Sequence, residues 1–197
     1  MGELIIGGIA PLTSIDYPGE LAAVVFTQGC PWRCVYCHNS ELQRPRSEST
    51  ICWERVLDFL QGRIGLLDAV VFSGGEPTAQ AALIEAVQQV KGMGFKIGLH
   101  SAGIYPRRLA RVLPYVDWLG LDVKGPAHVY ETITGVSGSG LAAWQSAKLV
   151  VNSLSHYQIR ITAHDHWLSQ QHVEETQREL ATLGATNITV QRAVGIR

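Results

Sequence analysis

Three of the four cysteines in this 197-residue sequence lie within eight residues, at Cys30, Cys34 and Cys37. Thiolates spaced as C-x3-C-x2-C are close enough to hold one small inorganic core. Three ligands leave one iron of a four-iron cluster open to a further molecule. A structural zinc site is the alternative, with His38 or Cys52 as its fourth ligand. We interpret Cys52, at the expected start of a helix, as a buried thiol of the core.

Polar and glycine-rich residues also follow the apolar, β-branched runs of the sequence. The segment Ser73–Pro77 (SGGEP) contains two adjacent glycines, which allow a ligand to approach the backbone closely. Glu76 in this segment is placed to accept a hydrogen bond from an amino group. Asp122 and Lys124, two residues apart, share one face of a strand end and suit a zwitterion or a ribose. Arg160 lies within an apolar strand, where a charge needs a partner: a core-facing Arg160 would pair with a carboxylate, and an outward-facing arginine is an at least equally common alternative.

Each of these observations has a plainer alternative. The glycine segment also fits an ordinary strand-to-helix turn, and Asp122 with Lys124 also fits a surface ion pair, which contributes little. Two histidines, His164 and His166, flank an aspartate and indicate either a second metal site or, as we expect, a solvated loop.

The elements that position these residues alternate between strand and helix. Such alternation predicts an α/β fold with a parallel sheet and right-handed crossovers. Six strand units fall short of the eight in a closed barrel, so we expect an open partial (β/α)6 barrel. The expected strands are 21–26, 68–72, 96–99, 118–122, 158–162 and 187–191, and the expected helices are 53–61, 79–91, a short one from Pro106, 142–151 and 169–183.

The carboxyl ends of parallel strands meet on one rim, which is where such folds carry out their chemistry. The segment that follows each expected strand is unusual in composition, so the motifs are predicted to converge there. These segments are 29–39, 73–77, 100–103 (HSAG), 122–125, 163–166 and 192–195.

Length and composition indicate one domain over 1–197, in which 1–20 is a lead-in segment. Tyr17-Pro18-Gly19 fits a type II turn. A formal net charge of −1 and the absence of a Lys/Arg run give no reason to expect nucleic acid. The sequence shows neither a signal peptide nor a membrane-length apolar stretch, so we expect a cytoplasmic protein without disulfides.

Together these features resemble the radical S-adenosylmethionine (SAM) superfamily and, within it, the small activating enzymes of anaerobic ribonucleotide reductase. The cysteine triad combined with the Gly-Gly-Glu-Pro segment is typical of the superfamily. The segments 15–19 (IDYPG) and Cys37-His38-Asn39 favour the activase branch. The resemblance covers nearly the whole chain, and its further motifs are Phe26, Gln28-Gly29-Cys30 and Leu121–Lys124.

The resemblance implies cofactors and partners. Cys30, Cys34 and Cys37 would bind a [4Fe–4S] cluster whose open iron takes SAM. A radical derived from SAM would then remove hydrogen from a glycine Cα of anaerobic ribonucleotide reductase, with a one-electron donor such as flavodoxin as reductant. The resemblance implies cofactor contacts by Tyr36 and His38, amino-group binding by Gly74, Gly75 and Glu76, ribose or carboxylate contacts by Asp122 and Lys124, and further contacts by Ser101, Arg160 and His164.

One departure from the family pattern concerns a monovalent cation. Related activases carry Asp-Thr-Asn-Gly where this chain has His100–Gly103, so the aspartate that supports a cation near the cofactor is missing. The rival readings are an activator of the pyruvate formate-lyase type, a small-molecule enzyme like the deazapurine-forming radical enzymes, and a non-catalytic zinc scaffold. An open rim favours an activase, whereas a closed polar pocket favours the small-molecule enzyme.

Overall fold

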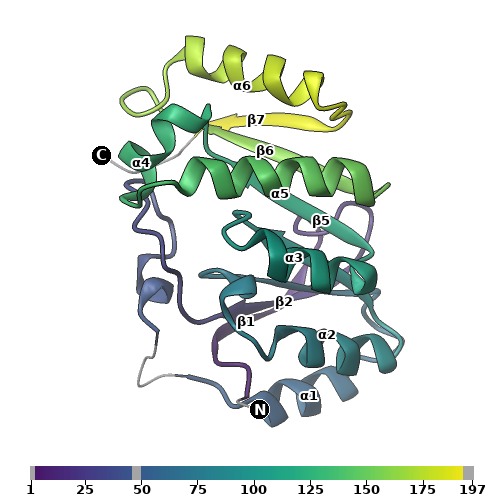
Figure 1. Cartoon of the computed structure of the whole chain (residues 1–197). Coiled ribbons are helices and arrows are strands. Elements are labelled where there is room, and N and C mark those ends of the chain that lie inside the picture. The colour runs from purple at the N-terminus through teal and green to yellow at the C-terminus, as the bar shows by residue number, and fades with distance from the viewer. Residues whose placement is uncertain (1–2, 46–49, 193–197) are drawn as a thin grey trace.

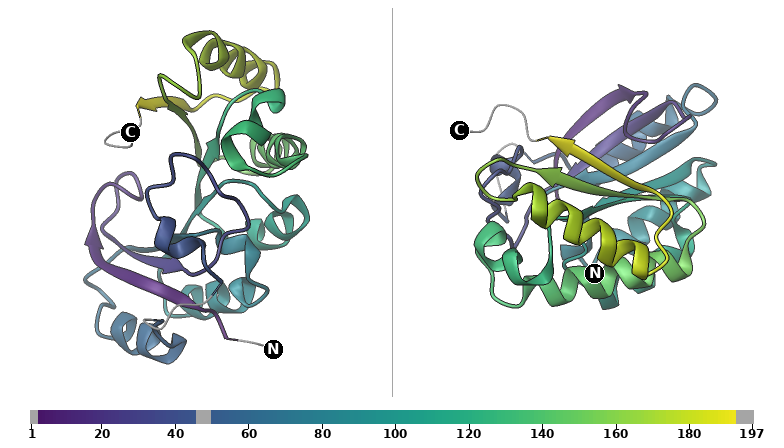
Figure 2. Two further views of the ribbon diagram at one scale, coloured as in Figure 1. Left: turned by 90° about the vertical axis from the view of Figure 1, so that its left-hand side faces the viewer. Right: turned by 90° about the horizontal axis from the view of Figure 1, so that it is seen from above.

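The computed structural model describes residues 3–45 and 50–192 of the chain. Seven strands form one sheet in the order β1-β2-β3-β4-β5-β6-β7, so each strand pairs with its sequence neighbours. The β1 strand is antiparallel to β2, and all the later pairs are parallel. Because the described sheet does not pair β1 with β7, it forms an open, curved arc (Figures 1 and 2). The expected partial α/β barrel is therefore confirmed.

Helices cover one side of the sheet, as the two views of Figure 2 show. The strands are β1 Ile6–Thr13, β2 Ala22–Thr27, β3 Ala69–Gly74, β4 Lys96–Ser101, β5 Trp118–Val123, β6 Tyr157–Ala163 and β7 Ile188–Arg192. The α-helices are α1 Trp53–Gln61, α2 Leu83–Gly92, α3 Pro106–Val112, α4 Tyr130–Thr134, α5 Ser139–Ser153 and α6 Gln170–Thr182.

The main hydrophobic core lies between the sheet and these helices. Alternate residues of a strand point to opposite faces, so each strand contributes every second side chain to this core. Val25, Phe72, Leu99, Leu121 and Ile161 are all at most 1% exposed and belong to it. The buried faces of the helices contribute the other half of this core. Because one face of each strand is buried, a shift of one residue would expose its apolar side chains, and this fixes the register of the strand.

The opposite face of the sheet encloses a second, smaller core. Tyr17, Val24, Val71 and Trp118 pack together here, and the rings of Tyr17 and Trp118 have centroids 5.4 Å apart. The turn that delivers Tyr17 has Gly19 at φ +84°, and the Glu20 amide donates to the Tyr17 carbonyl at 3.2 Å. The predicted type II turn is thus confirmed, and it places the Tyr17 ring in this second core.

The lead-in segment contains a strand that the sequence pattern did not predict, because Ile6–Thr13 is strand β1. The apolar run of this strand is interrupted by Gly7, Gly8 and Pro11, which are disfavoured in strands, so the sequence pattern does not predict it. These residues are tolerated because β1 lies at a sheet edge, where its pairing with β2 shifts register twice.

The other predicted elements are present with modified ends. Each of the six expected strands differs from the observed one by at most two residues at either end. Helix α2 begins at Leu83 instead of Ala79, because Pro77–Ala79 forms a separate 3-10 turn and Thr78 hydrogen-bonds to Glu76. The short helix α4 was not expected. None of the described helices has the length and apolar character needed to cross a bilayer.

Candidate active site

A cavity of about 320 Å³ opens at the carboxyl ends of the strands, on the rim that the sequence predicts. Its walls come from the segments after β2, β3, β4 and β5 and from residues of β6 and β7. The predicted site residues that line it are Cys30, Cys34, Tyr36, Cys37, His38, Gly74, Gly75, Ser101, Asp122, Lys124 and Arg160. Residues 193–195 of the last predicted segment lie outside the described residues.

The three cysteines of the triad lie in one loop after β2, and all three thiols are free and half-buried. The protein's own backbone holds this loop in place. The amides of Arg33 and Val35 donate to the carbonyls of Thr134 and Ile133 at 2.9 and 3.0 Å, which ties the loop to helix α4. At the other side of the loop, the Gly29 amide donates to the Leu42 carbonyl at 2.7 Å.

Tyr130 of α4 connects this loop to the end of β5. Its ring meets that of Trp32 edge-on, with centroids 5.9 Å apart, and its hydroxyl accepts a hydrogen bond from the Lys124 amide at 2.8 Å. Tyr130 is completely buried. The cysteine loop and the Asp122–Lys124 segment are therefore held by one shared side chain.

Cys52 is separate from this group. It is the N-cap residue of α1, is exposed and does not line the cavity. The helix start predicted there is confirmed, but the interpretation of Cys52 as a buried core thiol is wrong. Its position ahead of the helix leaves the side chain in solvent, whereas Trp53, Val56 and Leu60 are the residues that α1 buries fully in the core.

The thiols need a positive partner before they can act as ligands. Burial raises the pKa of Cys30 to about 12 and also raises the pKa of Cys34, so both thiols are protonated at neutral pH. Only thiolates bind metals well, and a metal supplies the charge that stabilises them. Among the described residues no three His, Cys, Asp or Glu side chains form a group that could hold a single metal ion.

The donor set fits an iron–sulfur cluster that carries a further ligand. Three thiols of one loop face the cavity, and the hydroxyl of Tyr36 beside them is buried and has no hydrogen-bond partner among the described residues. Burial raises the pKa of this phenol to about 12, so it keeps its proton and can donate. An unpaired buried hydroxyl is costly, and a ligand in the cavity would pair it.

His164 does not line the cavity, but it contacts Tyr36, which does. The His164 and Tyr36 rings stack with centroids 5.7 Å apart and planes 19° apart. The ammonium of Lys124 lies 5.5 Å from the centre of the Tyr36 ring. Within the described loop His164 accepts a hydrogen bond from the His166 amide, and His166 is exposed, which fits a solvated loop.

The two glycines after β3 pack against the cysteine loop. A Cβ on Gly75 would overlap the carbonyl of Gly29, and a Cβ on Gly74 would overlap the backbone of Thr27. Gly74 also has φ +113°, a conformation that side chains disfavour. The two glycines are therefore needed so that the backbone after β3 can lie directly against the backbone of the cysteine loop, whether or not a ligand is bound.

Glu76 lies behind the cavity wall and is completely buried. Its carboxylate accepts from the Thr78 amide at 3.1 Å, the Ser101 hydroxyl at 2.8 Å and the Ala102 amide at 2.9 Å, and also from the Thr78 hydroxyl. Burial raises its pKa although these donors oppose the shift. Glu76 therefore joins the loops after β3 and β4, and its contact with an amino group stays a prediction.

Asp122 and Arg160 form an ion pair inside the cavity. The Arg160 Nε atom lies 2.8 Å from Asp122 Oδ1, so the carboxylate partner predicted for Arg160 is present. Burial by itself would raise the pKa of Asp122, but Arg160 and Lys124 outweigh it and lower the pKa. Burial would likewise lower the pKa of Lys124, yet the nearby Tyr36, Cys34 and Asp122 raise it. Asp122 is therefore ionised and Lys124 charged at neutral pH.

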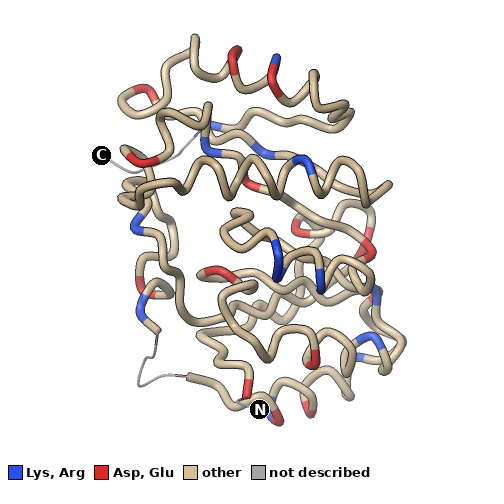
Figure 3. Tube along the Cα trace, viewed as in Figure 1, with Lys and Arg blue, Asp and Glu red and all other residues tan. Residues whose placement is uncertain are grey.

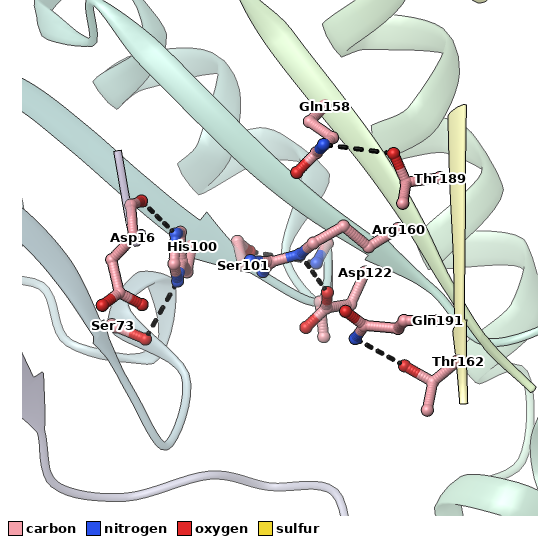
Figure 4. A network of polar contacts seen from close by, with 12 residues as sticks. Asp16, Ser73, His100, Ser101, Asp122, Gln158, Arg160, Thr162, Thr189 and Gln191 are labelled. Carbon is pink, nitrogen blue, oxygen red and sulfur yellow. Dashed lines mark hydrogen bonds and ion pairs between the residues drawn. The ribbon is translucent and has the colours of Figure 1, made fainter. Parts of the chain in front are cut away.

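His100 is the principal site residue to which the sequence motifs assigned no role. Figure 4 shows its ring between Asp16 and Ser73: one ring nitrogen lies 2.9 Å from the Asp16 carbonyl and the other 3.5 Å from the Ser73 hydroxyl. The carbonyl can only accept, so Nε2 carries the proton of a neutral ring. Asp16 also lines the cavity, which means that His100 fixes part of its floor.

Folding stability should depend on pH through His100. Burial, with a smaller contribution from Arg160, lowers its pKa from 6.5 to about 4. Between these two pKa values His100 is protonated in the unfolded chain but neutral in the folded chain. The free energy of unfolding therefore falls as pH drops from 6.5 towards 4, by about 1.4 kcal/mol per pH unit. Urea unfolding at pH 7, 6 and 5 should show a flatter profile for His100→Gln. The exposed His156→Gln should keep the wild-type profile, and equal slopes in all three proteins would refute the assignment.

Other residues of the site were not predicted. Thr162 and Gln191 line the cavity from inward-facing strand positions, which the alternation of β6 and β7 could have indicated, whereas Asp16 reaches the cavity from the turn after β1. Figure 3 shows Lys and Arg spread over several elements and interspersed with Asp and Glu. This distribution agrees with the charge argument made from the sequence.

Comparison with known proteins supports the geometry. A model of the radical SAM superfamily matches residues 24–188. The chain is 34% identical over 127 residues to a protein of Methanocaldococcus jannaschii named as a glycyl-radical enzyme activating enzyme, covering 62% of this chain and 51% of that protein. It is 32% identical over 149 residues to the pyruvate formate-lyase-activating enzyme of Clostridium pasteurianum, covering 70% and 61%.

A third relative is named as a peptide cyclase, and one similar solved structure contains a bound precursor peptide. The PqqA peptide cyclase of Rhodopseudomonas palustris is 45% identical over 111 residues, covering 55% of this chain and 27% of that one. SuiB of Streptococcus suis, solved with its precursor peptide SuiA, has a TM-score of 0.65 at 17% identity, covering 86% and 38%. The latter likeness shows the fold alone. The chain spans 51% to 61% of the length of the two activating enzymes.

Proposed function

The chain belongs to the radical SAM superfamily, and we propose that it is an activase that installs a glycyl radical on a larger partner enzyme. The superfamily uses a [4Fe–4S] cluster and SAM. One observation carries the proposal: the three thiols of the triad and the Asp122–Lys124–Arg160 group line the same cavity. When bound, the cluster supplies the electron that breaks the sulfonium bond of SAM and yields a 5′-deoxyadenosyl radical.

The chain's own residues bind and orient the cofactors. Cys30, Cys34 and Cys37 hold the cluster, and the buried rings of Trp32 and Tyr36 in the same loop limit the access of solvent to it. The charges of Lys124 and Arg160 attract the carboxylate of SAM, while Asp122 suits its ammonium or ribose hydroxyls. The Tyr36 hydroxyl gains a hydrogen-bond acceptor from the bound ligand.

The open edge of the sheet supports a macromolecular substrate. β1 and β7 do not pair in the described chain, which leaves the barrel open between them (Figure 2), and Gln191 of the edge strand β7 lines the cavity. A glycine-bearing loop can enter there, whereas a small-molecule enzyme would gain from a closed pocket. Similarity to the two activating enzymes supports the same reading.

We assign anaerobic ribonucleotide reductase as the partner and a one-electron donor such as flavodoxin as the reductant. The motifs at 15–19 and Cys37–Asn39 support the activase branch, and an activator of the pyruvate formate-lyase type is the alternative within it. A peptide-modifying enzyme is the second candidate, because the PqqA peptide cyclase matches over 111 residues.

The deciding experiment combines anaerobic reconstitution with candidate partners. The cluster-loaded and reduced protein should cleave SAM to 5′-deoxyadenosine and should produce a glycyl radical, seen by electron paramagnetic resonance, on the reductase. Radical formation on pyruvate formate-lyase instead would reassign the partner. Retention of zinc and no 5′-deoxyadenosine would defeat the enzyme assignment altogether.

A further inference from the structure

Two hydrogen-bonded pairs of uncharged side chains lie side by side on strands β6 and β7. Gln158 Nε2 donates to Thr189 Oγ1 at 3.1 Å, and Gln191 Nε2 donates to Thr162 Oγ1 at 3.1 Å (Figure 4). We call these four residues the Gln–Thr face. Thr189 and Gln191 are exposed, although they point to the same side of the sheet as Arg160.

This face is continuous with the catalytic cavity. Thr162 and Gln191 line the cavity together with Arg160, whereas Gln158 and Thr189 lie farther from it along the strands. Because β7 is an edge of the sheet, the Gln–Thr face forms the approach from the open side of the barrel. A segment that enters by this side must pass over it to reach the cysteine loop.

The chemistry of the Gln–Thr face matches a peptide backbone. Each pair uses one amide hydrogen and one hydroxyl lone pair, which leaves a glutamine carbonyl to accept and a threonine hydroxyl to donate. Thr189 and Gln191 are two residues apart in a strand, and an extended peptide repeats its amide groups at the same interval. None of the four side chains carries a charge, so the match does not depend on charged residues of the partner.

On the basis of the proposed activase function, we propose that the Gln–Thr face binds the backbone of the partner's glycine-bearing segment in an extended conformation. The segment is recognised through its amide groups on both sides of the glycine. Recognition by backbone places the glycine Cα by register, because a glycine has no side chain that a pocket could hold.

The test measures peptide affinity and SAM cleavage separately in the anaerobic, cluster-loaded protein with SAM. The probe is a capped, dye-labelled peptide of threonine, valine, serine, glycine, serine, valine and threonine, read by fluorescence anisotropy. Gln158→Leu and Thr189→Val each break the same hydrogen-bonded pair, Gln158–Thr189, whose residues do not line the cavity. Gln170→Leu and Thr182→Val make the same changes on the exposed surface of α6 and serve as matched controls.

Gln158→Leu and Thr189→Val should each weaken peptide binding about threefold to tenfold, the usual effect of one lost hydrogen bond. Both should leave SAM cleavage without peptide unchanged, and the controls should change neither quantity. A peptide N-methylated on both sides of its glycine should bind more weakly, and added salt should matter little. Equal affinity of the variants and the wild type, or no peptide binding by a wild type that cleaves SAM, would overturn the inference. A wild type that cleaves no SAM counts against the proposed activase function, while its peptide affinity still tests the Gln–Thr face.

Discussion

Alanine in place of Cys30, Cys34 or Cys37 should reduce SAM cleavage to below detection, whereas Cys52→Ala should leave it within about twofold of the wild type. The three thiols share one loop and one cavity, and a cluster that loses one of three protein ligands is not retained. Cys52 is an exposed N-cap residue whose side chain makes no capping hydrogen bond, so its replacement is a surface change of about 0.5 kcal/mol or less.

The measurement is 5′-deoxyadenosine formed per protein under dithionite, with iron and sulfide content determined on the same samples. Each triad variant should lose iron together with activity, and thermal unfolding should show that the chain remains folded. A Cys52→Ala protein that loses iron as completely as Cys34→Ala would mean that the cluster has a fourth protein ligand. The position of Cys52 on α1 would then have to differ in the loaded enzyme.

The second large effect is expected for Asp122→Asn. This change keeps the shape of the side chain but leaves the cations of Arg160 and Lys124 without their partly buried counter-charge. Truncating one partner of such a pair costs enough to lower SAM affinity by about a hundredfold. Equilibrium dialysis of SAM with the cluster-loaded protein measures this loss directly.

A double-mutant cycle separates the ion pair from general damage. If Asp122 acts mainly by holding Arg160, Asp122→Asn combined with Arg160→Gln should lose less affinity than the sum of the two single changes. Asp117→Asn is the matched control, because Asp117 forms a similar 2.8 Å ion pair with Lys91 away from the cavity. It should lower stability and spare SAM affinity. Strictly additive losses would show that Asp122 and Arg160 act on SAM independently.

The sequence was sufficient to predict where the site lies, for a physical reason. Parallel strands end on one rim, so residues placed after strands converge without any knowledge of contacts. That rule placed Cys30, Asp122 and Lys124 in one cavity, and of the two orientations that the sequence allowed for Arg160 the structure shows the one paired with a carboxylate.

Other features depended on contacts that are remote in sequence. Strand β1 exists because β2 pairs with it, in spite of Gly7, Gly8 and Pro11. The short helix α4 is stabilised by the cysteine loop, which lies about a hundred residues earlier in the chain. Two backbone amides of this loop donate hydrogen bonds to carbonyls of α4. His100 gained its role only when the turn containing Asp16 folded into the barrel. Local propensity carries no trace of such long-range partners.

The path of the cysteine loop is set by amide hydrogen bonds to α4 and to the Leu42 carbonyl, and none of these bonds involves a thiol. Oxidative loss of iron would therefore empty the loop without unravelling it. A damaged molecule keeps its cysteines in place, and repair reduces to delivering iron and sulfide, with little ordering entropy left to offset. The same polypeptide could then be reloaded with a cluster without refolding.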